Sequence, residues 1–501
     1  MINRTLYCTL ILAFLTTHIL SGQTKQEKQI DSLITVILKD FKEIPGLSIS
    51  VVKDKKPFFT KAYGYSNQKK QIKATIHTPY YIASVTKSFV GLLATKLESD
   101  GIINLDTSIE NYSPIKDFDD KSIFQNVTIR ELLSHRSGLR NDLLTWKFSA
   151  IGGYDYSSMV HLLEKKTRSL YNNKRYRYDN LGYNIFDIIL HEELGLSWKE
   201  LLEKEIFNPL GMNHTSANIS TAIKMDWSPA LPYVSINDKV IPREVLTKKN
   251  DKTFQAAGGI ISSIDDMQKF LMLYMNMGSI DGKKVFEDTL FSKTLFPYDK
   301  KKDKKDVFTS EGYGLGWHKG QFKDKNVFYH FGGFDGYFAH LSFLPKENIG
   351  IVILTNESHF GDNVSNLIAS LIYDFLTKPV KKEADHIEQI KKLRQRINQI
   401  QSAFKKDREI RAHRNWTLMH GFENYAGTYS NKLAGDIVIT VDKDVMTVNL
   451  GISKAIASPS SNDESVRVEL RDGRGRDILF ISNEDGTMAA VYNGYVFLKQ
   501  F

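Results

Sequence analysis

Apolar residues recur at helical intervals in several segments of this 501-residue chain. Intervals of three and four residues between apolar positions indicate helices that bury one face. They predict amphipathic helices over residues 25–42, 184–206, 258–278 and 362–376. Ser263, which is followed by two aspartates, is a candidate N-cap of the third helix.

Strand-like segments lie on both sides of this helical region. The stretches GLSISVVK (46–53) and PFFTKAYGYS (57–66) predict a hairpin around a charged turn. Three more strand-like runs follow at 313–320, 327–332 and 340–356, and the last turns at PKEN. This order predicts an α+β fold: an antiparallel sheet flanked by helices, with N-terminal and C-terminal strands and an inserted all-α region.

The pattern changes after Pro379. Residues 383–412 have apolar positions three and four apart and predict one long amphipathic helix. Beyond it, short alternating stretches separated by Gly, Asn and Asp predict a small all-β, barrel-like domain. We therefore expect a signal peptide at 1–22, an α+β domain at 23–378, a helical linker at 379–420 and a β domain at 421–501.

The first residues set the expected compartment. Arg4 precedes a mostly apolar run, and the small residues Ser21 and Gly22 precede a polar stretch, which is the pattern of a cleaved secretory signal peptide. We expect a secreted or periplasmic protein without stable membrane insertion. Because the only cysteine, Cys8, lies in this leader, the mature chain would have no thiol, disulfide or cysteine–zinc site.

The net charge of +9 is concentrated in one segment. Residues 381–414 contain 11 Lys or Arg and 5 Asp or Glu. They lack an aromatic-studded groove, so they indicate a solvated helix face rather than a nucleic-acid-binding surface. The charged stretch YDKKKDKKDV at 298–307 predicts a surface loop.

Helical spacing of apolar residues also begins in YIASVTKSFV (81–90), where Ser84 and Lys87 are three residues apart. One interpretation is structural: Ser84 caps the helix, because serine is a common N-cap residue. The other is chemical: Ser84 is a nucleophile at the positive end of the helix dipole, and Lys87 is its base one turn away. A base role requires burial or a second cation to lower the pKa of Lys87 by about three units.

Two later patterns also allow two interpretations. Tyr178 and Asn180 precede a predicted helix that Asn180 could cap. His330 and Gly332 end a predicted strand, where the glycines could form a hairpin turn with positive φ. In the chemical interpretation, these residues add the second proton carrier and the hydrogen-bonding groups that acyl transfer through serine requires.

Together, the three patterns resemble the S-x-x-K, Y-x-N and K-T-G motifs of the serine β-lactamase and penicillin-binding protein superfamily. Flanking stretches such as VTIRELLSHRSGL, FNPLGM and AAGGIISSIDDMQKFL are similar to its class C and esterase-like branch. The resemblance covers about residues 27–376. The tail, which opens with YAGTYS, is similar to the lipocalin-like domain appended to many such hydrolases; it would either shape substrate access or simply cap the enzyme.

The resemblance implies a role for each residue. Ser84 would attack the substrate carbonyl, and Lys87 and Tyr178 would share the proton transfers, with Lys87 making Tyr178 more acidic. Which of the two takes the first proton stays open. Asn180 would hydrogen-bond Lys87 and the substrate amide, and the backbone N–H groups of Ser84 and Gly333 would form the oxyanion hole. Neither a metal nor another cofactor is implied.

The third motif departs from the family pattern. K-T-G supplies a permanent cation and a hydroxyl for a substrate carboxylate, whereas His330 is mostly neutral at pH 7 and Phe331 has no hydroxyl. His330 and Gly332 would still support substrate binding. We therefore expect a Ser84 acyl-enzyme that hydrolyses a small-molecule ester or amide or a D-amino-acid peptide, rather than a strong β-lactamase.

Two alternatives remain. One is a penicillin-binding D-alanyl-D-alanine carboxypeptidase or weak class C-like β-lactamase, and the other is a non-catalytic binding or regulatory protein on the same fold. Elsewhere in the chain, His135 and Ser137 in SHRSG are expected to hold a loop. The stretch HEEL (191–194) lacks the second histidine of the zinc motif H-E-x-x-H.

Overall fold

The computed structural model describes residues 23–152, 155–170, 175–236, 242–247, 249–280, 282–303, 307–377, 383–482 and 487–500. The signal peptide expected at 1–22 and the expected boundary near 378 lie outside the described residues. None of the helices in the described ranges is long and apolar enough to cross a bilayer.

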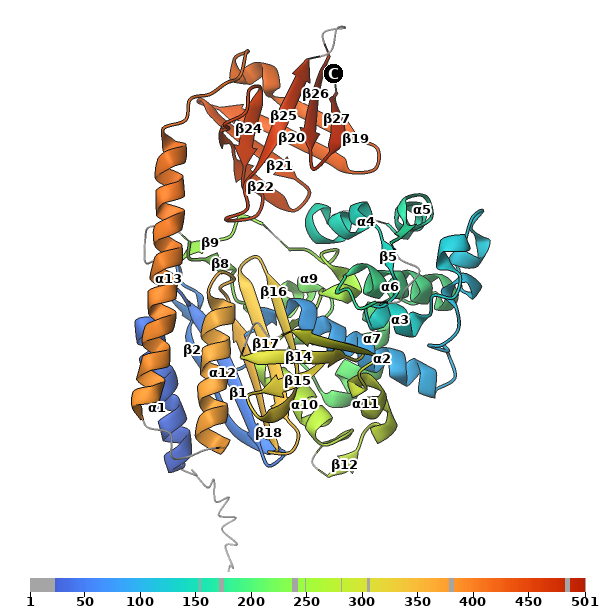
Figure 1. Ribbon diagram of the computed structural model, residues 1–501, viewed down its shortest axis with the longest axis vertical. Helices are drawn as coiled ribbons and strands as arrows, with labels where there is room; N and C mark the ends of the chain where they lie inside the picture. Colours follow the sequence, from blue (N-terminus) through green and yellow to red (C-terminus); the bar gives the residue numbers. More distant parts are fainter. Residues whose placement is uncertain are drawn as a thin grey trace, which may run out of the picture.

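A nine-stranded antiparallel sheet forms the centre of the larger domain, in the order β13-β14-β15-β16-β17-β18-β1-β2-β3 (Figure 1). Its strands are β13 Asp299–Asp303, β14 Phe308–Tyr313, β15 His318–Phe322, β16 Lys325–Phe334, β17 Tyr337–Leu344, β18 Ile349–Thr355, β1 Gly46–Lys53, β2 Lys56–Asn67 and β3 Ile72–Lys73. N-terminal β1 pairs with C-terminal β18, which confirms the predicted α+β fold.

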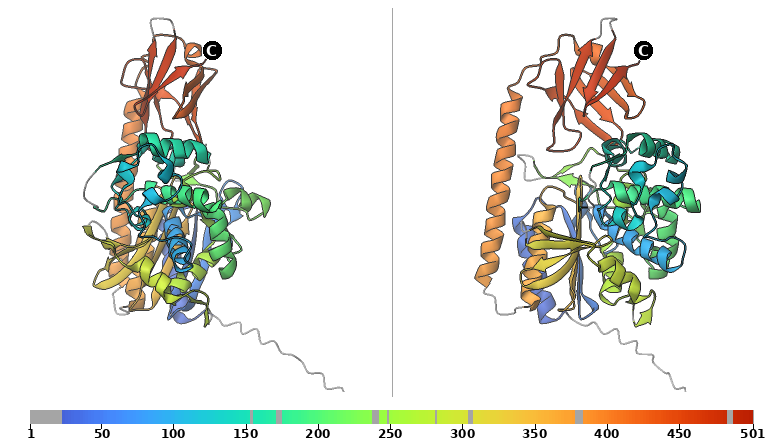
Figure 2. Two further views of the ribbon diagram at one scale, coloured as in Figure 1. Left: turned by 90° about the vertical axis from the view of Figure 1, so that its right-hand side faces the viewer. Right: turned by 45° about the vertical axis from the view of Figure 1, so that its right-hand side comes forward.

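Helices cover both faces of this sheet (Figure 2). They are α1 Lys25–Asp40, α12 Gly361–Thr377 and α13 Glu383–Ala412 on one face, and α2 Thr86–Ser99 and α10 Ile264–Met275 on the other. Alternation along β18 explains the layers: Ile351 and Ile353 pack in the core with α1 and α12, whereas Val352 and Leu354 pack with α2 and α10. The central strands are thus buried on both faces.

The inserted region is helical, as predicted. Its main helices are α3 Ile129–Leu133, α4 Asp142–Trp146, α5 Tyr156–Lys166, α6 Leu181–Leu194, α7 Trp198–Leu202 and α9 Ile219–Lys224. After it, α10 begins where the sequence indicates, because the side chain of Ser263 accepts a hydrogen bond from the backbone N–H of Asp266. The helical insertion lies beside α2 and therefore borders the segment that contains Ser84 (Figure 1).

The C-terminal domain is a nearly closed, barrel-like sheet of nine antiparallel strands, as predicted. The strands are β19 Gly427–Asn431, β20 Gly435–Asp442, β21 Val445–Leu450, β22 Ser453–Ile456, β23 Ser458–Pro459, β24 Ser465–Val468, β25 Arg476–Ser482, β26 Met488–Tyr492 and β27 Tyr495–Lys499. Alternation in β20 shows its inner face: Ile437 and Ile439 are buried, and Val438 is exposed.

Helix α13 connects the two domains and runs along the side of the larger one (orange, Figure 1). Ile390 and Ile397 are buried in the core under α1 and α12. Arg394 forms a forked ion pair with the buried Glu43, with Nη1–Oε1 and Nη2–Oε2 distances of 2.7 and 2.9 Å. This packing fixes the helix against the larger domain.

Two predictions for the C-terminal strands are wrong. The predicted strand at 313–320 is interrupted, because β14 ends at Tyr313 and β15 begins at His318. Gly316 lies between them with φ +82°, and a Cβ there would stand 2.2 Å from the carbonyl oxygen of Lys87, so this loop packs directly on α2. The predicted surface loop at 298–307 contains edge strand β13, a position where lysine-rich sequences are common.

We predict that Gly91→Ala in α2 destabilises the protein. A Cβ on Gly91 would lie 2.2 Å from the carbonyl oxygen of Leu315, which is backbone and cannot rotate away. The free energy of unfolding should fall by about 1–3 kcal/mol, despite alanine's better helix propensity. Denaturant unfolding measures this, and exposed Ser99→Ala in the same helix should change it by less than about 0.5 kcal/mol. Equal effects of the two substitutions would contradict the close packing.

Candidate active site

Ser84 lies in a 3-10 turn, Ala83–Val85, that leads directly into α2. The N-cap position of α2 is Val85 and has no side-chain cap hydrogen bond, so the prediction that Ser84 caps the helix is wrong. The hydroxyl of Ser84 instead lies 3.2 Å from Lys87 Nζ and hydrogen-bonds Tyr178. Ala83 has φ +45°, a backbone conformation that L-residues rarely adopt outside constrained sites.

The amine of Lys87 is fully buried and bonded to three segments of the chain. Nζ donates to Oδ1 of Asn180 at 2.8 Å and to the carbonyl oxygen of Ala257 at 2.6 Å, and it faces Ser84 Oγ. Burial lowers the pKa of Lys87 to about 7, while the negative charge of Asp179 acts in the opposite direction. The shift that a base role requires is therefore present, and burial is its cause.

These contacts accommodate both protonation states of Lys87. An ammonium has three N–H donors, which Asn180, Ala257 and the Ser84 oxygen can accept, whereas a deprotonated lysine has two donors and one lone pair. In the neutral form, Asn180 and Ala257 accept the two N–H groups and the lone pair faces the Ser84 hydroxyl. The interpretation of Asn180 as a helix cap is wrong on this point: α6 begins at Leu181 as predicted, but the Asn180 side chain makes no cap hydrogen bond.

Tyr178 lies at the mouth of the site, and its side chain is 40% exposed. Its hydroxyl points inward to Ser84, and Lys87 Nζ is 5.0 Å from its ring centroid. The prediction that Lys87 makes Tyr178 more acidic is wrong. Desolvation raises the pKa of Tyr178 above its ordinary value, the hydrogen bond with Ser84 acts in the opposite direction, and the charge of Asp179 adds to the rise. Tyr178 is therefore a neutral hydroxyl at pH 7.

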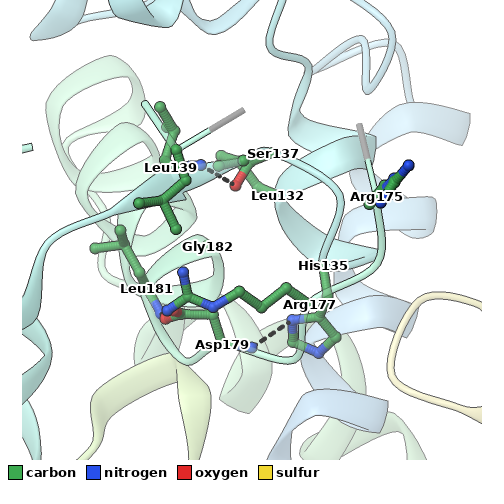
Figure 3. Close-up of a pocket in the computed structure, with 11 residues that line it drawn as sticks. Leu132, His135, Ser137, Leu139, Arg175, Arg177, Asp179, Leu181 and Gly182 are labelled. Carbon is green, nitrogen blue, oxygen red and sulfur yellow. Dashed lines mark hydrogen bonds and ion pairs between the residues drawn. The ribbon is translucent and has the colours of Figure 1, made fainter. Parts of the chain in front are cut away.

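His135 holds the loop that carries Tyr178. Its carbonyl oxygen accepts from the backbone N–H of Arg177 at 2.8 Å, and its Nδ1 accepts from that of Asp179 at 3.2 Å (Figure 3). The two bonds flank Tyr178, whose ring centroid lies 4.4 Å from that of His135. The loop-holding role predicted for His135 is thus seen directly, and Ser137 makes a local bond to the backbone N–H of Leu139.

His330 is buried, and both of its ring nitrogens are bonded. Nδ1 lies 2.9 Å from the carbonyl oxygen of Phe331, and Nε2 lies 3.0 Å from the hydroxyl of Tyr313. This pattern assigns the proton to Nδ1, and Nε2 accepts from Tyr313. Burial lowers the pKa of His330 well below its ordinary value, and charge on His318 and Lys87 adds to this effect. His330 is therefore a neutral wall of the site.

Gly332 and Gly333 lie within strand β16, so the interpretation of these glycines as a hairpin turn is wrong. A Cβ on Gly332 would stand 2.0 Å from the carbonyl oxygen of Ile82 and 3.0 Å from the backbone nitrogen of Ser84. Only glycine permits this approach. It brings the backbone of β16 beside the N–H of Ser84, as an oxyanion hole formed by Ser84 and Gly333 would require.

An open cleft of about 630 Å³ lies in front of Ser84. Besides Ser84 and the cationic Arg177, it is lined by ring-bearing side chains: Tyr176, Tyr178, His318, Tyr329, His330 and Phe331. Behind the Tyr178 loop is a small hollow of about 10 Å³, bordered by His135 and Asp179, with room for about one water molecule (Figure 3). Ser84 is therefore accessible to a substrate from the aromatic cleft.

Sequence reasoning missed two partners of the site. Ala257 contributes a backbone oxygen, which any residue type has, so no sequence signal marks it. Tyr313 belongs to the stretch YGLGW, where the predicted strand conceals the chain reversal that brings its hydroxyl to His330. A tyrosine that precedes two closely spaced glycines was the only available signal.

Comparisons with known proteins agree with this geometry. The β-lactamase family matches residues 34–372. Protein flp of Staphylococcus aureus (strain NCTC 8325 / PS 47) is 26% identical over 66% of this chain and 63% of its own length. Unguisins hydrolase ungD of Aspergillus violaceofuscus is 25% identical over 68% of this chain and 64% of its own length. The chain thus spans slightly less than two thirds of these curated relatives.

Solved structures share the fold. The octameric penicillin-binding protein homologue from Pyrococcus abyssi superposes on 94% of this chain with 99% of its own chain. The two share 22% sequence identity, and the TM-score is 0.60. D-amino acid amidase from Ochrobactrum anthropi SV3 covers 70% of this chain, and 100% of its own chain is covered, with 19% identity and a TM-score of 0.57.

The fold and the three motifs define a protein of the serine β-lactamase and penicillin-binding protein superfamily. The chain belongs to the β-lactamase family. One curated relative is named as a hydrolase, and one of the structural neighbours is a D-amino acid amidase.

We predict that Gly332→Ala damages the site, because the added Cβ would collide with the backbone of Ile82. The free energy of unfolding should fall by about 1–3 kcal/mol. Gly333→Ala is the matched control: its Cβ would have Phe338 at 3.7 Å as its nearest neighbour, so stability should change by less than about 0.5 kcal/mol. Chemical denaturation of both variants checks this, and an unaltered Gly332→Ala would contradict the close approach of β16.

Proposed function

We propose that the protein is an exported serine hydrolase that cleaves an ester or amide bond through an acyl-enzyme on Ser84. The observation that carries this proposal is the environment of Lys87. Its buried amine has acceptors for two N–H groups, lies 3.2 Å from Ser84 Oγ and has its pKa lowered to about 7. A group that titrates near the working pH is well suited to accept and return a proton.

In the proposed acylation step, neutral Lys87 takes the hydroxyl proton as Ser84 Oγ bonds to the carbonyl carbon. The backbone N–H groups of Ser84 and Gly333 stabilise the oxyanion. Tyr178 donates its proton to the leaving group as the scissile bond breaks, and Lys87 then reprotonates Tyr178. The raised pKa of Tyr178 supports its role as a donor and supports Lys87 as the first base.

Deacylation reverses the proton transfers. Water attacks the acyl carbonyl and loses a proton to the pair of Lys87 and Tyr178, while Ser84 Oγ leaves and regains its proton. The Oδ1 atom of Asn180 accepts a hydrogen bond from Lys87. Its amide NH2 group is a hydrogen-bond donor and would donate to a substrate carbonyl. One proton thus departs with the leaving group and one enters from water, so Ser84, Lys87 and Tyr178 return to their starting states.

The cleft favours a substrate with an aromatic or apolar group. Its walls are mainly rings, and His330 is buried and neutral, so His330 gives no cation to a substrate carboxylate. The cation among the lining residues, Arg177, is paired with Asp179 at 3.3 Å. A lost charge-assisted hydrogen bond would weaken penicillin or peptide carboxylate binding by about 1–3 kcal/mol. The structural likeness to a D-amino acid amidase supports including amides of D-amino acids among the tested substrates.

The direct test is labelling with a fluorophosphonate and with a fluorescent penicillin. We expect the fluorophosphonate to label wild-type protein and to leave Ser84→Ala unlabelled, with penicillin reacting slowly. Ser88→Ala is a matched control, because Ser88 lies one turn along α2 and bonds the carbonyl oxygen of Gly316 instead. Loss of labelling in Ser84→Ala alone supports the proposal.

Other outcomes of this test point elsewhere. No Ser84-dependent adduct with any probe would favour a non-catalytic binding protein. Rapid penicillin labelling, or nitrocefin turnover comparable with dedicated β-lactamases, would favour the penicillin-binding alternative.

The pH dependence follows from the state of Lys87. Its pKa of about 7 means that the reactive neutral amine is lost as pH falls, so kcat/KM should rise through pH 7 and level above it. At pH 6 it should be about tenfold below the plateau. Asp179→Asn keeps an acceptor for the Leu181 N–H but removes the charge that raises the pKa of Lys87, so the inflection should move to lower pH. A rate that is flat from pH 5.5 to 8.5, or an unmoved inflection, would exclude Lys87 as the base.

A further inference from the structure

The barrel contacts the larger domain just beyond the glycines of β16. Arg471, in the loop between β24 and β25, pairs with Asp335 in the turn between β16 and β17. Its Nη2 lies 3.0 Å from Oδ1 of Asp335, and its Nε lies 3.2 Å from both carboxylate oxygens. The Asp335 side chain is 13% exposed and the Arg471 side chain is 40% exposed, so the carboxylate is shielded from water while the guanidinium is partly solvated. A forked arginine–carboxylate pair fixes geometry better than a single contact does.

The same turn is also bonded by Lys249, a half-buried lysine. Lys249 Nζ donates to the carbonyl oxygen of Asp335 at 2.6 Å and lies 4.2 Å from the ring centroid of Phe334. Arg471 contacts the same ring, with its Cζ 5.4 Å from the centroid. Burial lowers the pKa of Lys249 to about 7, Asp335 opposes this change, and Arg471 adds to it. The barrel arginine is therefore part of the electrostatics around the end of β16.

Phe334 links this junction to the candidate active site. It is the last residue of β16 and follows Gly332 and Gly333. Its ring lies 4.6 Å from that of Phe254, in the segment that leads to Ala257, the acceptor for Lys87. It also lies 6.1 Å from the ring of Tyr81, three residues before Ser84.

We propose that the C-terminal barrel positions the hydrolase site: Arg471 holds Asp335 and thereby keeps the end of β16 in register with the Ser84 turn. Arg471 is a positioning residue, since it acts through Asp335 and Phe334. This inference rests on the proposed function, because the group it positions is the Gly333 N–H of the oxyanion hole. Displacing an oxyanion donor weakens binding of the transition state more than binding of the substrate, so the effect belongs in kcat.

The chain offers a matched control for this contact. The neighbouring residue of the same barrel loop, Asp472, pairs with Arg243 of β9 (Arg243–Glu244). That pair also joins the barrel to the larger domain, but β9 pairs with β8 (Tyr233–Val234) and not with β16. Removing it tests the effect of weaker docking without releasing the β16–β17 turn.

The experiment compares Arg471→Gln, Arg471→Lys and Arg243→Gln in the full-length protein, with a p-nitrophenyl ester as substrate. Arg471→Gln should lower kcat about tenfold and change KM by less than about twofold. Arg471→Lys keeps the charge and should recover part of kcat, and Arg243→Gln should change kcat by less than about twofold. Hydrogen–deuterium exchange of residues 331–338 should become faster in Arg471→Gln and stay unchanged in Arg243→Gln.

Equal losses of kcat in Arg471→Gln and Arg243→Gln, or an unchanged kcat in Arg471→Gln, would overturn the inference. An effect confined to KM would overturn it as well. If wild-type protein shows no Ser84-dependent turnover, the proposed function fails and the catalytic half of the inference fails with it. Hydrogen–deuterium exchange then tests separately whether Arg471 holds the end of β16. Equal exchange of residues 331–338 in all variants would reject this structural part of the inference as well.

Discussion

A lysine amine that is buried in a protein needs hydrogen-bond partners for its N–H groups. Burial also disfavours its charged form, so the pKa of the amine falls. The partners of Lys87 in this structure are Ser84, Asn180 and Ala257, which come from three separate segments. The lowering of its pKa to about 7 corresponds to roughly 5 kcal/mol in favour of the neutral form. The site therefore depends on how tightly the fold closes these segments around one nitrogen atom.

That closure is achieved where the backbone itself packs against its neighbours. Gly91 and Gly316 bring α2 and the loop before β15 together, and Gly332 brings β16 onto the Ser84 turn. At each position a Cβ would stand 2.0–2.2 Å from a carbonyl oxygen. Gly332 thus has a packing function rather than the turn function that its position first indicates. His330 then completes the wall as a buried, neutral group bonded to Tyr313. The cleft therefore has no positive charge at the position where the K-T-G motif of the family supplies a lysine.

Much of the fold follows from periodicity. Helical spacing in 25–42 and 383–412 and the short alternating strands of the tail each report which face of a segment is buried, and the structure bears them out. The stretches 46–53 and 57–66 form the predicted hairpin, and β1 is buried on both faces. The residue types of the candidate site were also accessible, because three short motifs stand in family order. The interruption at Gly314–Trp317 was not accessible, because apolar residues in a packed loop resemble those of a strand.

The sequence by itself determined the elements, the class of protein and the names of the candidate residues. Only the tertiary structure decided which partners those residues bond. Ser84 and Asn180 each had a local capping alternative worth about 1 kcal/mol, and each instead bonds within the cluster around Lys87. The direction of the Tyr178 pKa shift likewise depends on desolvation by distant segments. Periodicity reports the burial of a face, but the partner of a polar side chain depends on which remote segments packing brings beside it.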